Sequence, residues 1–387
     1  MGIVQQSLIN GDDTDMKRLG FTTSEEGSLG VEIEFQIIDP KTGHLMSRAK
    51  ELIRSIKQSR YQDYIKPEIT QSMLEINSSI HSSAKSLYKE FLKIRAFLLD
   101  QARKMDLYFC GGGTHPYQEW ASRKIFPAPR FRNISMQQRY LSKRSVCGLH
   151  VHIGCKNAED ALYLTHTLTR FVPQFIALSA SSPFFLEMDT GYHSSRSHLY
   201  SLHPLSGVMP YLLTWQEFSN YYYKMRKLGV ISSMKDFFWD IKPKPEYGTV
   251  EVRVCDAPLT IKKAVLIAAY IQSLSLYLLH EKPVSPTTDQ YLIYEYNRFQ
   301  ASRYGFAGDF INPYNLRHAT ISNDIINTIK TIKKYIHRLN NTNLINRLKK
   351  DVLANVNDAT LSRNIYKKTH SFSKMVLQHC ALWEKGN

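Results

Sequence analysis

The segment Gly148-Leu149-His150-Val151-His152-Ile153-Gly154 decides the fold class, because polar and apolar residues alternate along it. Successive side chains of a β-strand point to opposite faces of a sheet. A strand over these residues therefore places His150 and His152 on one face and three apolar side chains on the other. The alternation predicts a half-buried strand that carries two imidazoles on its polar face.

Three further segments show the same alternation. If all four strands join one sheet, a single polar surface gathers their carboxylates and imidazoles, and the apolar faces require a packing layer behind the sheet. The polar faces of the three segments carry Glu32 and Glu34 (within 30–39), Met73, Glu75 and Asn77 (within 73–77), and Glu251 and Arg253 (within 248–255).

Long apolar helices are available as that packing layer. Apolar residues recur at helical spacing over 83–105, and the segments 158–178 and 261–280 are mainly apolar, which predicts three helices. Strands and helices together predict an α+β fold, with helices packed behind the sheet. We expect residues 1–28 to be a flexible leader, residues 29–300 to form the main domain, and residues 301–387 to form a basic helical segment packed on that domain.

Composition restricts the kinds of partner and the compartment. The formal charge of +16 favours anionic ligands, and residues 301–387 contribute fourteen Lys and Arg against five Asp and Glu. Five irregularly spaced cysteines favour a reducing compartment. The acidic N-terminal residues do not form a signal peptide, and the apolar run 264–279 is too short and too interrupted to cross a membrane. The sequence therefore predicts a soluble cytoplasmic protein without a membrane partner.

The polar surface has a structural and a functional interpretation. A solvent-facing side of an antiparallel sheet is sufficient to explain one alternating strand. Four strands dense in Glu and His favour a metal–phosphate site, because clustered carboxylates repel one another and bound Mg²⁺ removes that cost. The residues Cys147, His150, His152 and Cys155 also suggest zinc, but a regular strand places the two cysteines opposite the histidines, which disfavours a tetrahedral site.

Three loops each have two interpretations. The glycine-rich segment 111–116 either lets backbone N–H groups approach a phosphate or forms a structural turn. The donor-rich loop 189–196 is either solvated or presents Arg196 to a carboxylate or phosphate. Trp239 either forms a wall of the site or packs in the core.

The ordered motifs resemble the bacterial carboxylate–amine ligases of the glutamate–cysteine ligase type 2 family. The resemblance covers nearly the whole chain, from Leu29 to Trp383. It rests on the order and spacing of motifs at 30–35, 68–75, 111–116, 148–154, 177–183, 189–196, 239–241 and 248–253.

The resemblance implies an enzyme with a glutamine-synthetase-like catalytic fold, in which a curved, mainly antiparallel sheet is lined by acidic residues. Its expected cofactors are ATP and two or three Mg²⁺ ions. The implied reaction phosphorylates a small-molecule carboxylate to an acyl phosphate, which an amine then attacks to give an amide or peptide bond, with weak glutamate–cysteine ligase activity. Relatives of this kind also imply a homodimer, and residues 29–300 then become the ligase catalytic domain.

The resemblance also implies roles for individual residues. The implied catalytic residues are Arg253, Arg196 and Glu251. The implied metal ligands are Glu32, Glu34, Glu68, Glu75, His150 and Glu251. His152 and Arg253 are expected to bind the nucleotide, with Arg253 on the transferring phosphoryl group, and the residues expected to bind substrate are Arg196, Tyr192 and Trp239.

Two alternatives remain open from the sequence. One is an amidohydrolase or a protein-modifying variant on the same scaffold, which differs from the ligase in its requirement for ATP. The other is a basic nucleic-acid-binding protein, suggested by the positive charge of the chain. The absence of a helix-turn-helix, RNA-recognition or zinc-finger signature in the sequence disfavours the second alternative.

Overall fold

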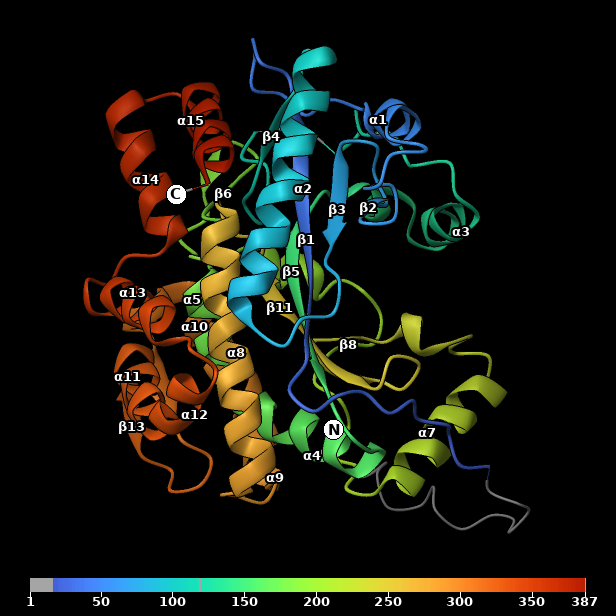
Figure 1. Ribbon diagram of the computed structural model, residues 1–387, viewed down its shortest axis with the longest axis vertical. Helices are drawn as coiled ribbons and strands as arrows, with labels where there is room; N and C mark the ends of the chain where they lie inside the picture. The colour runs from blue at the N-terminus through green and yellow to red at the C-terminus, as the bar shows by residue number, and fades with distance from the viewer. Residues whose placement is uncertain (1–16, 118–119, 387) are drawn as a thin grey trace.

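A seven-stranded antiparallel sheet forms the centre of the computed structural model, which describes residues 17–117 and 120–386 (Figure 1). The strands lie in the order β10-β11-β5-β1-β3-β2, and β4 pairs with β1 beyond the end of β5. Together with the surrounding helices, this sheet confirms the predicted α+β class. The strands are β1 (Leu29–Ile38), β2 (Ile65–Pro67), β3 (Met73–Asn77), β4 (Tyr108–Cys110), β5 (Gly148–Gly154), β10 (Ile241–Lys244) and β11 (Thr249–Asp256).

The register of the sheet brings the predicted polar residues onto one face. Residues that lie directly opposite each other in antiparallel strands project from the same face. All four alternating segments are strands of this sheet, so the predicted common surface is confirmed. The opposed pairs are Glu34 with Glu75, Glu32 with His150, and Glu251 with His152.

A β-bulge interrupts the pairing of β11 with β5 between Val252 and Cys255. One extra residue in a bulged strand reverses which face the following side chains occupy. Cys255 therefore joins Val254 in the hydrophobic core, and Asp256 lies on the other face, where three serines bond to its carboxylate. The regular alternation read from the sequence is wrong at this end of β11.

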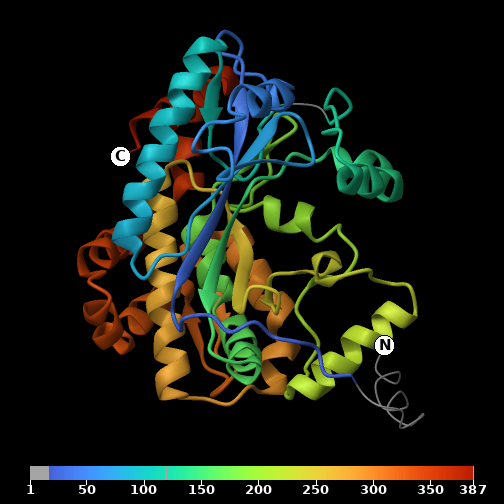
Figure 2. The same ribbon diagram turned by 45° about the vertical axis from the view of Figure 1, so that its right-hand side comes forward.

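Two long helices cover the apolar face of the sheet, as Figures 1 and 2 show. The helix α2 (Ala84–Lys104) begins at Ser83, whose side chain accepts a hydrogen bond from the Ser86 amide. Its partner α8 (Ile261–Glu281) is the one described helix long and apolar enough to cross a membrane, yet 83% of its apolar window is buried inside the protein. The two helices share one large core with β1, β5 and β11, so α8 is a core helix.

The predicted helix over 158–178 is two helices, α4 (Ala158–Thr169) and α5 (Val172–Ser179). The break follows Arg170, and Pro173 lies in the first turn of α5. Proline has no N–H to donate to the preceding turn, so it begins a helix more readily than it continues one. Both helices are buried, so the apolar pattern continues through them. The sequence pattern therefore does not show the break between them.

The remaining helices and short strand pairs surround this centre. The helices are α1 (Ala49–Ser55), α3 (Pro129–Gln138), α6 (Arg196–Tyr200), α7 (Trp215–Lys227), α9 (Thr288–Leu292), α10 (Tyr294–Tyr304), α11 (Ile321–Thr331), α12 (Lys333–Arg338), α13 (Thr342–Leu353), α14 (Asp358–Thr369) and α15 (Phe372–Lys385). The two-stranded sheets pair β6 (Phe184–Phe185) with β7 (Met188–Asp189), β8 (Ser206–Gly207) with β9 (Phe238–Trp239), and β12 (Asp309–Ile311) with β13 (His318–Thr320).

Both ends of the described chain pack on the central domain. Residues 1–16 of the predicted leader lie outside the described residues, but the Thr22 and Gly27 amides donate to backbone carbonyls beside β10 and at the end of β5. The predicted boundary at residue 300 lies inside α10. At the other end, Trp383 of α15 contacts the rings of Phe35 and Phe109 in the sheet. The helical C-terminal segment is thus part of the same core.

Candidate active site

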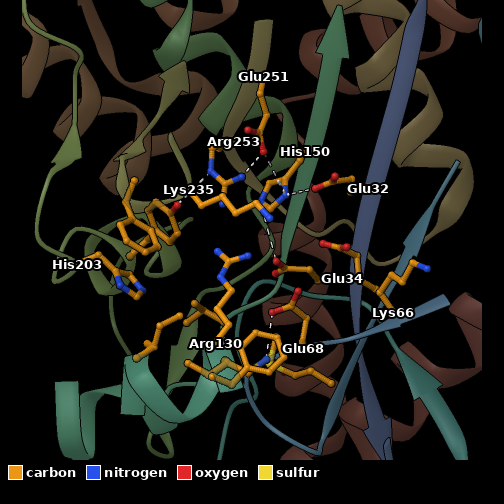
Figure 3. A pocket seen from close by; sticks show the side chains of 18 of the residues that line it. Glu32, Glu34, Lys66, Glu68, Arg130, His150, His203, Lys235, Glu251 and Arg253 are labelled. Carbon is orange, nitrogen blue, oxygen red and sulfur yellow. Dashed lines mark hydrogen bonds and ion pairs between the residues drawn. The ribbon is translucent and has the colours of Figure 1, made fainter. Parts of the chain in front are cut away.

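A cavity of about 440 Å³ lies on the polar face of the sheet (Figure 3). One side carries acidic residues and imidazoles from four strands and the turn after β2. The facing side carries basic side chains, and Figure 3 shows Arg130 across from Glu34 and Glu68, with Arg253 beside Glu251 where the two sides meet. We call the first set the carboxylate wall; it consists of Glu32, Glu34, Glu68, Glu75, Glu251, His150 and His152. The second set, the arginine wall, consists of Arg130, Arg144, Arg196 and Arg253.

Neighbouring strands hold the carboxylate wall in a fixed arrangement. The Glu32 carboxylate lies 2.9 Å from His150 Nδ1, and the Glu34 carboxylate accepts the Gly148 amide at 2.5 Å. Ligand atoms of the wall form three groups, each with its atoms within 4.8 Å of one another. The groups are Glu32 with His152 and Glu251, Glu32 with Glu75 and His150, and Glu34 with Glu68 and Glu75.

The donor atoms of these groups fit a divalent cation. Among the described residues, the buried Nε2 atoms of His150 and His152 and the buried Oε2 of Glu251 have no hydrogen-bond partner. An unsatisfied buried polar atom is costly unless a ligand completes its bonding. Because oxygen donors predominate, the set suits a hard cation such as Mg²⁺ better than zinc.

The cysteines do not contribute to a metal site, so the zinc interpretation is wrong. Within the described residues, the groups that could hold a metal ion consist of glutamates and histidines. Cys147 packs with Met73 and Ala257, and Cys155 lies in the main hydrophobic core.

Burial and mutual repulsion shift the acidity of the carboxylate wall. Burial, reinforced by the negative charge of Glu34, raises the pKa of Glu68 to about 8. Burial and the neighbouring Glu32 raise the pKa of Glu75 well above its usual range. Glu68 therefore holds a proton at neutral pH that a bound cation would displace.

Glu251 behaves differently because cations surround it. Burial acts to raise its pKa, but Arg253 and Lys242 outweigh that effect and lower the pKa well below its usual range. Arg253 donates to the Glu251 carboxylate, and Lys242 Nζ lies 3.8 Å from it. Burial and the charge of Arg253 lower the pKa of His150, which keeps its imidazole neutral and available as a ligand.

Three of the four arginines of the arginine wall come from helix starts and a loop, and the fourth, Arg253, lies on β11. Arg144 follows a 3₁₀ turn (Arg139–Lys143) just before β5, and Arg196 begins α6. The Arg196 amide donates to Ser182 Oγ, which itself donates to the Asp256 carboxylate. The serine-rich loops thus form a scaffold that fixes the start of α6 against the end of β11.

The structure brings most of the predicted site residues together. All six predicted metal ligands line the cavity, as do Arg196 and Arg253, and His152 contacts Glu32 and Glu251 at its edge. Tyr192 is not brought to the cavity: its ring contacts His198 and its carbonyl accepts Arg363. Trp239 is buried in a second hydrophobic cluster, where it stacks on Phe237 with ring centroids 4.1 Å apart.

The glycine-rich loop packs against the domain instead of lining the cavity. Its Gly112 amide donates to the Ala257 carbonyl, and its Gly113 amide donates to Ser181 Oγ. A side chain at Gly113 would collide with the Asp256 carboxylate. The structural interpretation of this loop is therefore the correct one, because its amides are used inside the protein.

Sequence reasoning missed several basic residues of the cavity. Lys242 and Lys244 occupy alternate positions of β10, so the same two-residue spacing that found Glu251 and Arg253 signals them. Arg130 and Arg144 lie in a helix and a loop without strand or helical periodicity that would direct them to the site. Only the folded chain brings these two residues to the cavity.

Comparison with known proteins agrees with this geometry. The family model described as Glutamate-cysteine ligase family 2 (GCS2) matches residues 28–359. The chain belongs to this family. It is accordingly a ligase of the glutamate–cysteine ligase type, which forms C–N bonds.

Relatives and solved structures extend the comparison. The chain is 55% identical to "Putative glutamate–cysteine ligase 2-2" of Legionella pneumophila (strain Lens), over 95% of this chain and 96% of that one. It is 43% identical to "Putative glutamate–cysteine ligase 2" of Herminiimonas arsenicoxydans, over 94% and 99%.

Two solved structures share the fold at low sequence identity. One is a glutamate–cysteine ligase from Francisella tularensis in complex with AMP, with a TM-score of 0.68 and 12% identity, covering 94% of this chain and 90% of that chain. The other is a bifunctional glutathione synthetase from Pasteurella multocida, with a TM-score of 0.66 and 13% identity, covering 92% and 52%.

Proposed function

We propose that this protein is an ATP- and Mg²⁺-dependent carboxylate–amine ligase that works through an acyl phosphate, with glutamate and cysteine as the first substrates to test. The observation that carries the proposal is the opposition of the carboxylate wall and the arginine wall across one cavity. Phosphoryl transfer from ATP to a carboxylate brings two anions together, and this cavity offers cation ligands on one side and fixed cations on the other. The names of the family and of its relatives support the choice of substrates.

The reaction has two steps. A carboxylate oxygen of the acid attacks the γ-phosphorus of ATP, and ADP leaves. The amine nitrogen then attacks the acyl carbon and loses a proton, and inorganic phosphate leaves. The protein supplies no covalent nucleophile in either step, so its task is to position the reactants and to stabilise charge.

The residues of the two walls divide that task. A bound Mg²⁺ would supply positive charge that offsets the charge developing during phosphoryl transfer. Glu32, Glu75 and Glu251 are the residues that would hold it, because Glu32 shares one group with Glu251 and another with Glu75. Arg253 is held by Glu251 and by Tyr200, whose hydroxyl lies 3.2 Å from Arg253 Nε, so its guanidinium is oriented before a phosphoryl group arrives.

The proposal is tested by measuring ADP release with Mg²⁺-ATP and glutamate, alone and with cysteine or a panel of other amines. We expect release that depends on the amine and is lost in Glu251→Gln, because this substitution removes a buried carboxylate of the wall without changing its size. Glu187→Gln is the matched control, since Glu187 is exposed on a turn and is not among the residues that line the cavity.

The outcomes separate the proposal from its alternatives. ADP release that persists in Glu251→Gln contradicts the proposed role of the carboxylate wall. Cleavage of an amide without ATP contradicts the ligase and supports a hydrolase on the same scaffold. No ATP binding in the presence of Mg²⁺ contradicts the proposed function as a whole.

A further inference from the structure

A second cavity, of about 220 Å³, lies between the helices α2 and α15 and the strand β4. Figure 1 shows these three elements together at one end of the molecule. None of the residues that line this cavity also lines the cavity between the two walls. One of its lining residues is Cys380 of α15, which carries a free thiol. A small molecule in this second cavity therefore reaches a thiol that the proposed ligase reaction does not use.

Cys380 has a second thiol beside it. Cys110, the last residue of β4, packs with Cys380 in a small cluster completed by Ile38, Leu45 and Val376. A hydrogen bond between the two thiols, together with burial, raises the pKa of Cys110 well above its usual range. Adjacent sulfur atoms are the first requirement for a disulfide. The pair thus has an outer thiol that lines the cavity and an inner thiol in contact with it.

The other three cysteines are arranged differently. Cys155 and Cys255 lie in the main hydrophobic core, and Cys147 packs with Met73 and Ala257. None of these three lines either of the two cavities. Buried thiols in apolar surroundings are inert, whereas a thiol that lines a cavity can react with a molecule inside it. Reactivity is therefore expected at Cys380 first.

The charged residues of the second cavity indicate the kind of molecule that fits it. Arg103 and Glu384 lie 3.5 Å apart at its edge, and Asp106 is a second exposed carboxylate in its lining. A guanidinium binds a carboxylate, and carboxylates accept hydrogen bonds from an ammonium group. With the thiol of Cys380, these groups suit a small disulfide that carries both an α-ammonium and an α-carboxylate.

We propose that Cys380 and Cys110 form a redox-active dithiol, which a zwitterionic low-molecular-weight disulfide such as cystine oxidises to an intramolecular disulfide. The Cys380 thiolate attacks one sulfur of cystine, which forms a mixed disulfide and releases one cysteine. The Cys110 thiolate then attacks the sulfur of Cys380, which forms the Cys110–Cys380 bond and releases the second cysteine. The dithiol loses two electrons and two protons, and cystine gains them.

The new bond joins two parts of the chain that are distant in sequence. It attaches α15 to β4, whose residue Cys110 pairs with Gln36 of the central strand β1. A crosslink of this kind restricts the unfolded chain and so stabilises the folded protein. In a reducing compartment the pair remains as thiols, and the bond forms when small disulfides accumulate. The inference concerns a site outside the active site and does not depend on the proposed function.

Peptide mapping of the full-length protein tests the proposal. The reduced protein is incubated with cystine at mildly alkaline pH, the remaining thiols are blocked, and its peptides are analysed by mass spectrometry. We expect a single disulfide between Cys110 and Cys380 and an unfolding temperature about 5 °C higher, which dithiothreitol reverses. The absence of this bond, or a bond between other cysteines, overturns the proposal.

Variants test the order of the two steps. We expect Cys110→Ala to stop at a mixed disulfide on Cys380, and Cys380→Ala to leave Cys110 reduced. Cys155→Ala removes a buried cysteine of the main core and is the matched control, which should form the bond as the wild type does. An adduct on Cys110 in Cys380→Ala contradicts the assigned order. Thermal unfolding of the reduced variants checks that they are folded, and the wild-type peptide map does not depend on them.

Cystamine tests the kind of disulfide, because it has the ammonium groups of cystine but lacks the carboxylates. We expect cystine to oxidise the wild-type pair about fivefold faster than cystamine, and Arg103→Gln to reduce this preference below about twofold. Lys104→Gln is the matched control, because Lys104 pairs with Asp100 and does not line the cavity. Equal rates with the two disulfides in the wild type overturn the assignment of a zwitterionic oxidant.

Discussion

The two walls of the cavity carry opposite charge and arise in different ways. The carboxylate wall comes mainly from four neighbouring strands, where opposed residues share a face by register. The arginine wall comes from a helix, a loop, the start of α6 and a bulged end of β11. One wall follows from strand geometry, and the other requires the complete fold.

The walls also satisfy their charges differently. Burial, together with repulsion between the carboxylates, raises the pKa values of Glu68 and Glu75. Arg144 and Arg196 have no carboxylate partner among the described residues. Both arrangements are costly for the ligand-free protein, and both are relieved by a ligand of opposite charge. The difference supports the proposal that the site takes two kinds of ligand at once, cations at the carboxylate wall and anions at the arginine wall.

The largest expected effect comes from neutralising the carboxylate that two of the metal groups share. We expect Glu32→Gln to lower kcat/KM for ADP release about 10³-fold and to weaken Mg²⁺ binding, because Glu32 also orients His150. Calorimetry and steady-state rates measure the two effects. The control Glu26→Gln changes a glutamate that pairs with Lys156 and His280 outside the cavity, and it should retain activity. If Glu32→Gln binds Mg²⁺ with wild-type affinity, the assignment of the carboxylate wall as the metal site is contradicted.

A smaller effect is expected where the two walls meet, at Gly148. A methyl group here would overlap Arg196 Nη2 and come within 3.2 Å of His150 Nε2. We expect Gly148→Ala to displace Arg196 and to lower kcat/KM about 10²-fold. Gly30→Ala on the neighbouring strand is the matched control, because its methyl group would meet only His152 Cβ, at 3.6 Å. Equal rates in both variants would contradict the close packing of Arg196 against β5.

A modest effect is expected from pH on the carboxylate wall. Since the folded-state pKa of Glu68 is about 8, its contribution to stability is full below the unfolded pKa and is lost as pH rises towards 8. A bound cation removes that loss, so Mg²⁺ should raise the unfolding temperature more at pH 8 than at pH 6, by roughly 2 °C. Calorimetry with Mg²⁺ or EDTA measures the difference. Glu68→Gln should reduce it, and a shift that shrinks at pH 8 would contradict this electrostatic account.

The smallest effect on activity is expected at Trp239, which lies behind the site. Trp239→Phe should lower the free energy of unfolding by about 1 kcal/mol, because the smaller ring has less contact area with Phe237 in the second hydrophobic cluster. We expect the KM values for acid and amine to remain within twofold of wild type. A selective rise in one KM would instead support the substrate contact predicted from the sequence.

How much the sequence could predict follows from the same contrast. Alternation of polar and apolar residues alone is sufficient to predict the strands that carry Glu32, Glu75 and His150, because a half-buried strand shows this two-residue period in its sequence. Glu68 is indicated only by the family resemblance, since it lies just after the end of β2 in a segment without a regular period.

The remaining features depend on contacts that are distant in the sequence. The bulge that turns Asp256 away from the core has no marker in the alternating pattern, and neither has the burial of Arg144. The break between α4 and α5 was obscured because both helices are buried on most sides, although Pro173 marks the place. Trp239 and Tyr192 belong to motifs near the site, but their side chains pack on other elements. Proximity in sequence was therefore a poor guide to which side chains line the cavity.

The central claim is that ATP activates a carboxylate as an acyl phosphate in this cavity. It is tested most directly by supplying glutamate with ¹⁸O in its carboxylates, together with Mg²⁺-ATP and cysteine, and examining the released phosphate by ³¹P NMR. The account predicts that one ¹⁸O atom from the acid enters phosphate for each amide formed. Amide formation with unlabelled phosphate, or no phosphate release at all, would contradict it.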